Sequence, residues 1–324
     1  MYKMKALPST GLSVESAMSS SPECHSLPQG FEFDSYRIDH LLSQGGFSFV
    51  YLAHDAAGTP VVIKEYLPAH LVHRPAGAAE PQIPPESLGS FNRGLRSFLE
   101  EARLLARIRH PNIVAVLNFA KANRTAYLVM RHETGQTLET HMVDLRKRGV
   151  AIDEAFLRLV FVRLLSGLRE VHKEKLLHLD LKPANIFLRQ DGNPVLLDFG
   201  AARWGLGGVD NSLGCVYTPG FAAPEQQGSG EPLGPWTDIY AIGATLYACL
   251  DGGVIPPAAK MRANNPALEP AQSRWAGRYS LQLLELIDWC MQLAIDRRPQ
   301  SVHALQKSLN GELLEIVDPN WFQS

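Results

Sequence analysis

Cysteine is scarce in this sequence, and the few cysteines present are scattered. The chain of 324 residues has four of them, Cys24, Cys215, Cys249 and Cys290, and no two lie at the close spacing of a zinc site. A disulfide framework or a cysteine metal centre needs several cysteines at short intervals, so the sequence argues against both. The scarcity favours a protein of the reducing cytoplasm.

The sequence also lacks an excess of charge of either sign and lacks long apolar runs. Lys and Arg total 31 against 33 Asp and Glu, which gives a net charge of −2. Nucleic-acid-binding surfaces are strongly basic, so we expect no nucleic-acid partner. A spanning helix needs roughly 18 consecutive apolar residues, and no window here has them, so no membrane span is expected. The N-terminal stretch also lacks the apolar core of a secretory signal.

The first half of the chain reads as short strands. Residues 1–33 are rich in Ser, Pro and Gly without periodicity, which predicts a disordered arm. A Pro-, Ala- and Gly-rich loop or insertion covers 68–94, and apolar residues at helical spacing predict a helix over 95–109. Strand-like runs occur at 36–42, 48–54, 60–67, 110–120 and 125–133.

The second half of the chain is dominated by helical patterns. These cover 152–173, 236–251 and 280–309, while the tail at 311–324 is too short to be a domain. Strands first and helices second predict an α+β fold of two lobes within 34–310. We expect a small β-rich lobe with one helix at 34–131 and a larger α-helical lobe at 132–310.

The most informative stretch is HLDLKPAN at 178–185, which is followed by DFG at 198–200. Transfer of the terminal phosphoryl group of ATP builds up negative charge, so a protein must hold Mg²⁺ and orient an acceptor hydroxyl. Two aspartates then have different tasks, with Asp180 placed to orient the hydroxyl proton and Asp198 to bind metal. The amide oxygen of Asn185 suits a second metal position, and Lys182 can neutralise the transferred phosphate.

These motifs resemble the catalytic loop and the metal-binding loop of protein kinases, and the resemblance extends over roughly 36–309. It implies a two-lobe kinase fold, ATP as the phosphate donor and Mg²⁺ as the metal, with Mn²⁺ as an alternative. LLSQGGFSFVYLAH resembles the glycine-rich loop that cradles phosphates, although serine occupies two of its three glycine positions. The nucleotide-binding residues that the resemblance implies there are Ser43, Gly45, Gly46, Phe47, Ser48 and Val50.

Two further stretches carry nucleotide-binding residues by the same resemblance. VVIK at 61–64 makes Lys64 the residue that holds the α- and β-phosphates, with Glu101 as its partner on the following helix. AYLVMRHETG resembles the strand that enters the hinge between the lobes. It places Met130 behind the adenine ring and the backbone groups of Arg131 and Glu133 beside it.

The region after DFG resembles the activation segment of kinases, which ends here in TPGFAAPE. The resemblance implies an ion pair between Glu225 and Arg298. It also places Asp238 under the catalytic loop, where its carboxylate accepts backbone N–H bonds. His178 is expected to pack against Phe199 and not to act as a base.

Acceptor specificity is indicated by two residues. Lys182 follows Asp180 by two positions, and Thr218 precedes Glu225 by seven. In the kinase family both features go with serine/threonine specificity, because the threonine hydroxyl bridges the aspartate and the lysine. We therefore expect protein substrates with Ser or Thr acceptors, the chain itself among them.

Leu179 occupies a position where most regulated kinases have arginine, which binds a phosphate on the activation segment. The hypothesis is that phosphorylation of this segment does not gate activity through residue 179. Ser212, Tyr217 and Thr218 are candidate autophosphorylation sites, and Arg203 is the alternative clamp.

KEYLP, the insertion at 68–94 and DFGAAR with TPGFAAPEQ resemble bacterial, particularly proteobacterial, serine/threonine kinases. Two alternatives stay open at this point. One is a pseudokinase that acts as a nucleotide-binding scaffold, which the two serines in the glycine-rich loop favour. The other is a small-molecule kinase, which TPGFAAPE disfavours.

Overall fold

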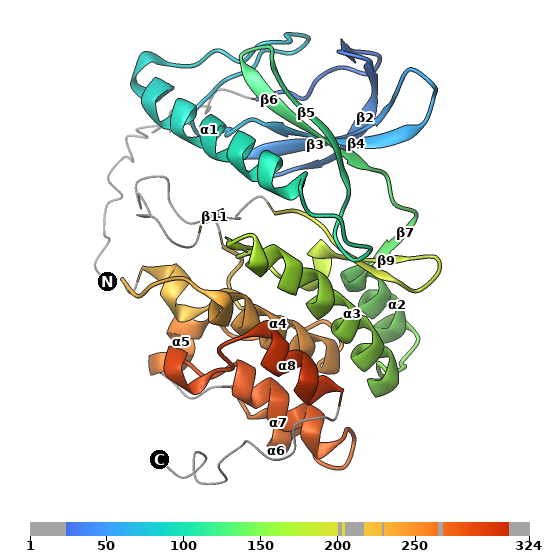
Figure 1. The fold of residues 1–324 in the computed structure, drawn as a ribbon, viewed down its shortest axis with the longest axis vertical. Coiled ribbons are helices and arrows are strands. Elements are labelled where there is room, and N and C mark those ends of the chain that lie inside the picture. Colours follow the sequence, from blue (N-terminus) through green and yellow to red (C-terminus); the bar gives the residue numbers. More distant parts are fainter. Residues whose placement is uncertain (1–23, 200–202, 205–216, 229, 265–267, 311–324) are drawn as a thin grey trace, which may run out of the picture.

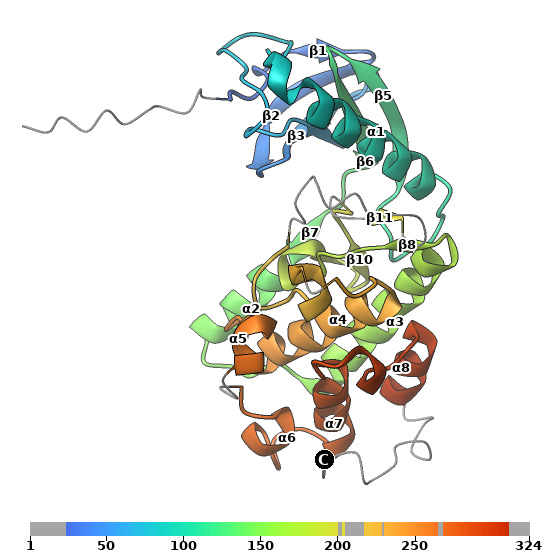
Figure 2. The same ribbon diagram turned by 90° about the vertical axis from the view of Figure 1, so that its left-hand side faces the viewer.

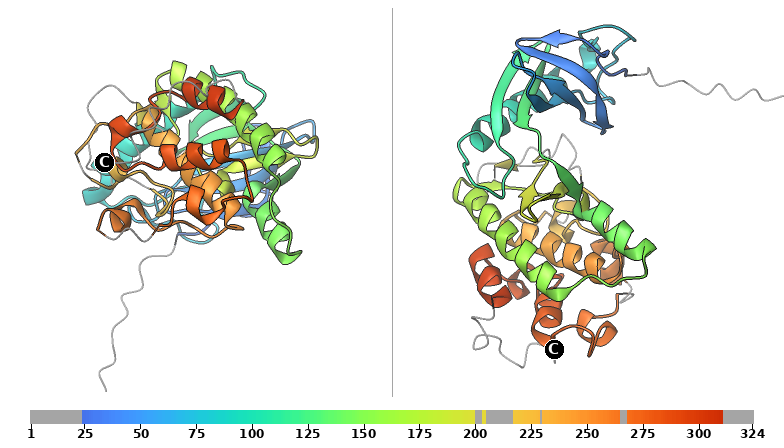
Figure 3. Two further views of the ribbon diagram at one scale, coloured as in Figure 1. Left: turned by 90° about the horizontal axis from the view of Figure 1, so that it is seen from below. Right: turned by 90° about the vertical axis from the view of Figure 1, so that its right-hand side faces the viewer.

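The fold has two lobes stacked along the long axis of the molecule, a sheet with one long helix above and a group of helices below (Figure 1). The computed structural model describes residues 24–199, 203–204, 217–228, 230–264 and 268–310. The predicted α+β architecture, with a small β-rich lobe and a larger helical lobe, is confirmed. The same stacking is visible from two further sides (Figure 2; Figure 3, right).

The upper lobe is built on a six-stranded antiparallel sheet with the order β1-β2-β3-β4-β6-β5. In β3 every second residue is fully buried, as the alternation of a strand requires. The strands are β1 (Glu32–Phe33), β2 (Tyr36–Gln44), β3 (Ser48–His54), β4 (Pro60–Tyr66), β5 (Val116–Ala122) and β6 (Thr125–Arg131).

Helix α1 (Leu88–Leu105) covers one face of this sheet. Its buried stripe includes Phe91, Phe98 and Glu101, and the ring of Tyr66 on β4 lies 5.2 Å from Phe91 and 5.8 Å from Phe98. The helix begins seven residues before the predicted start at 95, so the predicted loop at 68–94 is corrected to 67–84, with a 3₁₀ turn η1 (Pro85–Ser87) leading into α1.

The opposite face of the sheet is covered by chain segments from before β1 and after β4. Arg74 is fully buried and donates to Glu65 at 2.5 Å and to the Tyr51 hydroxyl at 3.0 Å, while Leu27 N–H donates to Tyr51 at 3.1 Å. The predicted disordered arm is therefore wrong for 24–33, because these residues pack on the sheet; residues 1–23 lie outside the described residues. The composition of 24–33 did not predict this packing, because the side chains that bind the segment, Tyr51 and Arg74, lie outside it.

The lower lobe packs around α4 (Pro235–Leu250), in which every residue from Thr237 to Leu250 is buried. The predicted helix at 280–309 is corrected to two helices, α7 (Leu281–Cys290) and α8 (Val302–Leu309), because Arg298 and Pro299 fall in the turn between them. The other helices are α2 (Leu138–Lys147), α3 (Glu154–Lys173), α5 (Ala259–Asn264) and α6 (Ala271–Arg274). Seen from below, these helices lie under the sheet of the upper lobe (Figure 3, left).

Short strands lie where the two lobes meet. One small sheet has the order β10-β9-β7, and β8 pairs with β11. These strands are β7 (Gly135–Thr137), β8 (Leu176–Leu177), β9 (Ile186–Arg189), β10 (Pro194–Leu196) and β11 (Arg203–Trp204). No helix in the described part of the chain is long and apolar enough to span a bilayer, and the predicted tail at 311–324 lies outside it.

Candidate active site

The stretch HLDLKPAN follows β8 and ends in the 3₁₀ turn η2 (Pro183–Asn185), and a buried carboxylate binds its first backbone N–H groups. Asp238 on α4 accepts the N–H of His178 on Oδ2 at 2.9 Å and the N–H of Leu179 on Oδ1 at 2.8 Å, and His172 Nε2 lies 2.8 Å from Oδ2. Burial raises the pKa of Asp238, but the hydrogen bonds from His172 and the Leu179 N–H outweigh burial and bring this pKa below its ordinary value. The predicted role of Asp238 under the catalytic loop is confirmed.

Leu179 is held in an unusual backbone conformation. Its φ is 63°, in the left-handed region that costs a non-glycine residue about 1–2 kcal/mol. Asp238 binds its N–H, and the side-chain amide of Gln226 donates to its carbonyl at 2.8 Å. The leucine side chain is buried and apolar, so it offers no charge to a phosphate. Gln226 was not among the predicted site residues, although it directly follows TPGFAAPE in the sequence.

Asp180, Lys182 and Thr218 form a closed triangle of hydrogen bonds. Thr218 Oγ1 donates to Asp180 Oδ1 at 2.7 Å, and Lys182 Nζ donates to Asp180 Oδ2 at 2.8 Å and to Thr218 Oγ1 at 2.7 Å. Asn185 Nδ2 also donates to the Asp180 carboxylate at 3.0 Å and to its carbonyl at 2.8 Å. The predicted bridge from Thr218 to Asp180 and Lys182 is confirmed.

Lys64 connects the sheet to the loop after β10. Its ammonium donates to Asp198 Oδ1, whose backbone also adopts a positive φ of 51°. Burial lowers the pKa of Lys64, but the acidic groups around it, Asp198 first among them, outweigh burial, and the pKa lies above its ordinary value. Lys64 therefore carries its charge into the site at neutral pH.

Glu101 does not form the predicted ion pair with Lys64. Within the described residues Lys64 pairs with Asp198, and Glu101 Oε1 is buried without a hydrogen-bond partner. Burial raises the pKa of Glu101 to about 8, against the lowering effect of Lys64. Burial disfavours the charged form of Glu101, so Lys64 pairs with the half-exposed carboxylate of Asp198 instead, which is the physical reason for the correction.

His178 and Phe199 pack together as predicted, with their ring centroids 4.6 Å apart. His178 Nε2 lies 2.9 Å from the carbonyl of Leu197, and complete burial lowers the pKa of the imidazole. A neutral, buried histidine with a backbone partner is suited to holding the loop and not to moving protons. Gly200, the last residue of DFG, lies outside the described residues.

Val50 and Met130, two of the predicted adenine-binding residues, share one face of the sheet. Val50 lies opposite Lys64 in the β3–β4 pair, and Met130 lies opposite Val62 in the β4–β6 pair, so their side chains point to the same side. Met130 is buried, in keeping with a place at the back of a pocket.

One backbone group of the hinge already has a partner within the chain. The N–H of Arg131 donates to the Ala115 carbonyl at 2.9 Å. The predicted contact of Arg131 with adenine would therefore use its carbonyl and not its N–H. The Glu133 carboxylate accepts two bonds from Arg189, at 2.6 and 2.8 Å, so its side chain fixes the hinge to β9.

The glycine-rich loop joins β2 to β3 through residues 45–47. Ser43 and Ser48 are strand residues, paired with Val50 and Tyr66 respectively, so neither position requires a glycine. The tip is tied to the chain after β4, because Ala69 N–H donates to the Gly46 carbonyl at 3.2 Å and Leu67 N–H to the Phe47 carbonyl at 2.9 Å. The ring of Phe47 also lies 4.9 Å from that of His70.

The predicted metal-binding residues offer oxygen atoms of the type that Mg²⁺ prefers. Asn185 uses its NH₂ group on Asp180, which turns its oxygen away from that carboxylate. Asp198 contributes a half-exposed carboxylate. Mg²⁺ is typically held by one or two protein oxygens together with substrate phosphates, and this donor set fits that pattern. Groups of three or more His, Cys, Asp or Glu side chains able to hold a metal are absent from the described residues.

The predicted ion pair between Glu225 and Arg298 is confirmed, with distances of 2.7 and 3.0 Å. Both side chains are fully buried. Glu225 belongs to the 3₁₀ turn η4 (Pro224–Gln227), and Arg298 follows α7, so the pair ties the end of the activation segment to the helical lobe. Ser212 and the side chain of Arg203 lie outside the described residues.

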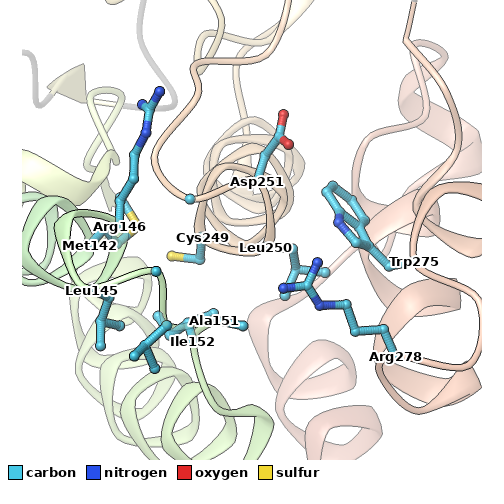
Figure 4. Close-up of a pocket in the computed structure, with 13 residues that line it drawn as sticks. Met142, Leu145, Arg146, Ala151, Ile152, Cys249, Leu250, Asp251, Trp275 and Arg278 are labelled. Atoms are coloured by element: carbon cyan, nitrogen blue, oxygen red, sulfur yellow. The ribbon is translucent and has the colours of Figure 1, made fainter.

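A hollow of about 280 Å³ lies elsewhere in the helical lobe (Figure 4). Met142 and Leu145 of α2, Cys249 near the end of α4 and Trp275 line it. None of the residues around Asp180, Lys64 or Asp198 takes part in its walls. It is separate from the candidate active site.

A sheet lysine bound to an aspartate of the lower lobe, beside a second aspartate held by lysine, threonine and asparagine, defines a two-lobed phosphotransferase of the kinase class. The model of the protein kinase domain family matches residues 36–309. The chain belongs to the protein kinase family.

Curated relatives carry the names of serine/threonine-protein kinases. PknA of Nostoc sp. is 32% identical over 229 residues, which cover 67% of this chain and 37% of that protein. Pkn2 of Myxococcus xanthus is 30% identical over 295 residues, covering 85% of this chain and 32% of that protein. The chain thus spans about a third of the length of these curated relatives.

A solved structure named "PpkA-294 apo form" is 36% identical, with a TM-score of 0.75, and the match covers 88% of this chain and 99% of that one. The kinase domain of Mycobacterium tuberculosis PknI, at 20% identity and a TM-score of 0.66, shares the fold. The resemblance to bacterial serine/threonine kinases inferred from the motifs is confirmed.

Proposed function

We propose that this chain is an ATP- and Mg²⁺-dependent serine/threonine protein kinase. It transfers the γ-phosphoryl group of ATP to Ser or Thr hydroxyls of proteins in bacterial signalling. The names of the relatives support this function and give no support to the alternative of a nucleotide-binding scaffold.

The observation that carries the proposal is the triangle of Asp180, Lys182 and Thr218. A substrate hydroxyl that enters beside Asp180 finds a carboxylate oxygen to accept its proton and an ammonium group within reach of the phosphate. The Thr218 hydroxyl bridges both and keeps their spacing fixed. This arrangement provides the positioning that phosphoryl transfer requires.

The remaining site residues bind the nucleotide in this proposal. Lys64 holds the α- and β-phosphates, the chain at 43–50 covers the phosphates and the adenine, and Met130, Arg131 and Glu133 surround the adenine edge. Asn185 and Asp198 would hold Mg²⁺, which supplies positive charge to the phosphate oxygens when bound. Mn²⁺ is the alternative cation.

The proposed partners are proteins with exposed Ser or Thr acceptors, together with a second copy of the chain in autophosphorylation. The cytoplasm is the proposed location, because it supplies ATP and because Cys24, Cys249 and Cys290 are free thiols. A turnover on the order of 1–100 per second is typical of protein kinases.

The experiment compares three otherwise identical acceptor peptides with Ser, Thr or Tyr at one position. The purified chain is incubated with each peptide and ATP, with Mg²⁺ or with EDTA, and transferred phosphate is measured by mass spectrometry. We expect phosphate on the Ser and Thr peptides, little on the Tyr peptide, and none with EDTA. Nucleotide binding without transfer to any peptide or to the chain itself would contradict the proposed activity.

A further inference from the structure

The end of the activation segment contacts the catalytic loop at two adjacent residues. At one end, Thr218 donates to Asp180. At the other end, Gln226 donates to the carbonyl of Leu179 at 2.8 Å. Two attachment points fix the orientation of one segment against the other, whereas a single hydrogen bond leaves it free to rotate.

Both polar groups of the Gln226 amide are used. Nε2 donates to Leu179 O, and Oε1 accepts the N–H of Ala223 at 3.0 Å. The residue is only 4% exposed, so water cannot replace these bonds without opening the packing. A buried amide with both ends satisfied acts as a rigid strut between η4 and the catalytic loop.

The strut acts on the residue immediately before Asp180. Leu179 has a left-handed backbone, a conformation that persists in a non-glycine residue only where its surroundings impose it. Asp238 holds the N–H of Leu179, and Gln226 holds its carbonyl, which belongs to the peptide unit shared with Asp180. The orientation of that peptide unit sets the position of the Asp180 Cα, and therefore the position of the Asp180 side chain.

Gln226 is itself anchored through its neighbour. Glu225 binds Arg298 in a fully buried ion pair and accepts the Thr237 hydroxyl at 2.9 Å. The path from the helical lobe to the catalytic loop therefore consists of described, buried groups, and no phosphate is part of it.

We propose that Gln226 is a positioning residue for phosphoryl transfer. It acts through the Leu179 carbonyl on Asp180, and it couples the activation segment to the catalytic loop without a phosphate group. The side chain of Leu179 is buried and apolar, so the connection at this residue runs from its backbone carbonyl to Gln226. The inference rests on the proposed kinase function.

The test uses two substitutions of Gln226 and one control in the full chain. Gln226→Met keeps the length but cannot bond Leu179. Gln226→Glu cannot donate as a carboxylate, but a protonated carboxyl has one O–H donor and one carbonyl acceptor, the two functions that the Gln226 amide uses here. Gln227→Ala is the matched control, because Gln227 Nε2 donates at 3.2 Å to Ala222 within its own segment. For each variant, kcat and the KM for ATP are measured on the Ser peptide from pH 5.5 to 8.5, relative to the wild type at each pH.

We expect kcat of Gln226→Met to fall by about 10- to 100-fold at every pH, because a small displacement of Asp180 has a cost of that order, while the KM for ATP changes less than about threefold. For Gln226→Glu we expect an equally low relative kcat at pH 8.5 that recovers towards the wild type at pH 5.5. Gln227→Ala should stay within about twofold of the wild type. A merely structural role would not produce the recovery at low pH.

The proposal is overturned if Gln226→Met retains wild-type kcat, or if the relative kcat of Gln226→Glu does not change with pH. If the wild type itself transfers no phosphate, the proposed function fails separately, and hydrogen exchange then decides the coupling. In that case faster exchange of the Leu179 and Asp180 amides in Gln226→Met than in Gln227→Ala supports the strut, and equal exchange rejects it.

Discussion

Lys64 faces two carboxyl groups that lie in different environments. Asp198 is half exposed and binds the ammonium directly, whereas Glu101 is only 7% exposed and leaves one oxygen without a partner. Burial raises the pKa of Glu101 to about 8, which favours its protonated form. The charge of Lys64 is therefore balanced by Asp198 in this structure.

Glu101 should make the stability of the protein depend on pH. Its pKa rises from 4.5 in the unfolded chain to about 8 in the folded one, so between these values the folded state holds a proton that the unfolded state releases. The free energy of unfolding should then fall as pH rises through this window, by up to about 1.4 kcal/mol per pH unit from this group. Glu101→Gln, which stays neutral, should flatten the dependence in urea unfolding from pH 5.5 to 8.5. Equal slopes in the two proteins would show that Glu101 ionises normally.

At the scale of elements, hydrophobic periodicity predicted strands whose pattern is complete within their own residues. SFVYLAH alternates as a strand does and forms β3 over the predicted residues. The start of α1 was missed because Gly89 and Gly94 weaken a helical pattern in sequence. The fold needs Gly94, since a Cβ there would collide with the Tyr66 hydroxyl and lie 2.9 Å from Tyr66 Cζ. A packing requirement of this kind is invisible until the strand and the helix are placed together.

Two glycines of α1 should therefore respond differently to alanine. Gly94→Ala should lower the free energy of unfolding by about 1–3 kcal/mol, because Tyr66 is buried and must move. Gly89→Ala is the control, since its Cβ would meet only Arg93 Nη1 at 3.7 Å; helix propensity should then leave stability unchanged or raise it by up to about 1 kcal/mol. Chemical denaturation of both variants measures the difference, and equal effects would contradict the packing argument.

At the scale of the whole molecule, the motifs predicted which residues come together in the site, but not which carboxylate pairs with Lys64. Asp180, Lys182 and Thr218 meet as the motifs imply, and the Asp238 and Glu225–Arg298 contacts also follow them. Lys64 pairs with Asp198 and not with Glu101 because burial disfavours the charged form of Glu101, and the burial of a residue is not given by the sequence. The role of segment 24–33 as a cover for the sheet likewise depends on Arg74, which pairs with Glu65 and donates to the carbonyl of His25, 49 residues earlier in the chain.

The central claim, that Asp180 serves phosphoryl transfer from ATP to a Ser or Thr hydroxyl, is tested most directly by one comparison. The initial rate of phosphate transfer from Mg-ATP to the Ser peptide is measured for the wild type and for Asp180→Asn, with ATP affinity measured beside it. We predict a fall of about 100-fold or more, with affinity within about threefold, because removing a group that receives the proton costs that much. Equal rates in the two proteins would show that the chemistry does not run through Asp180.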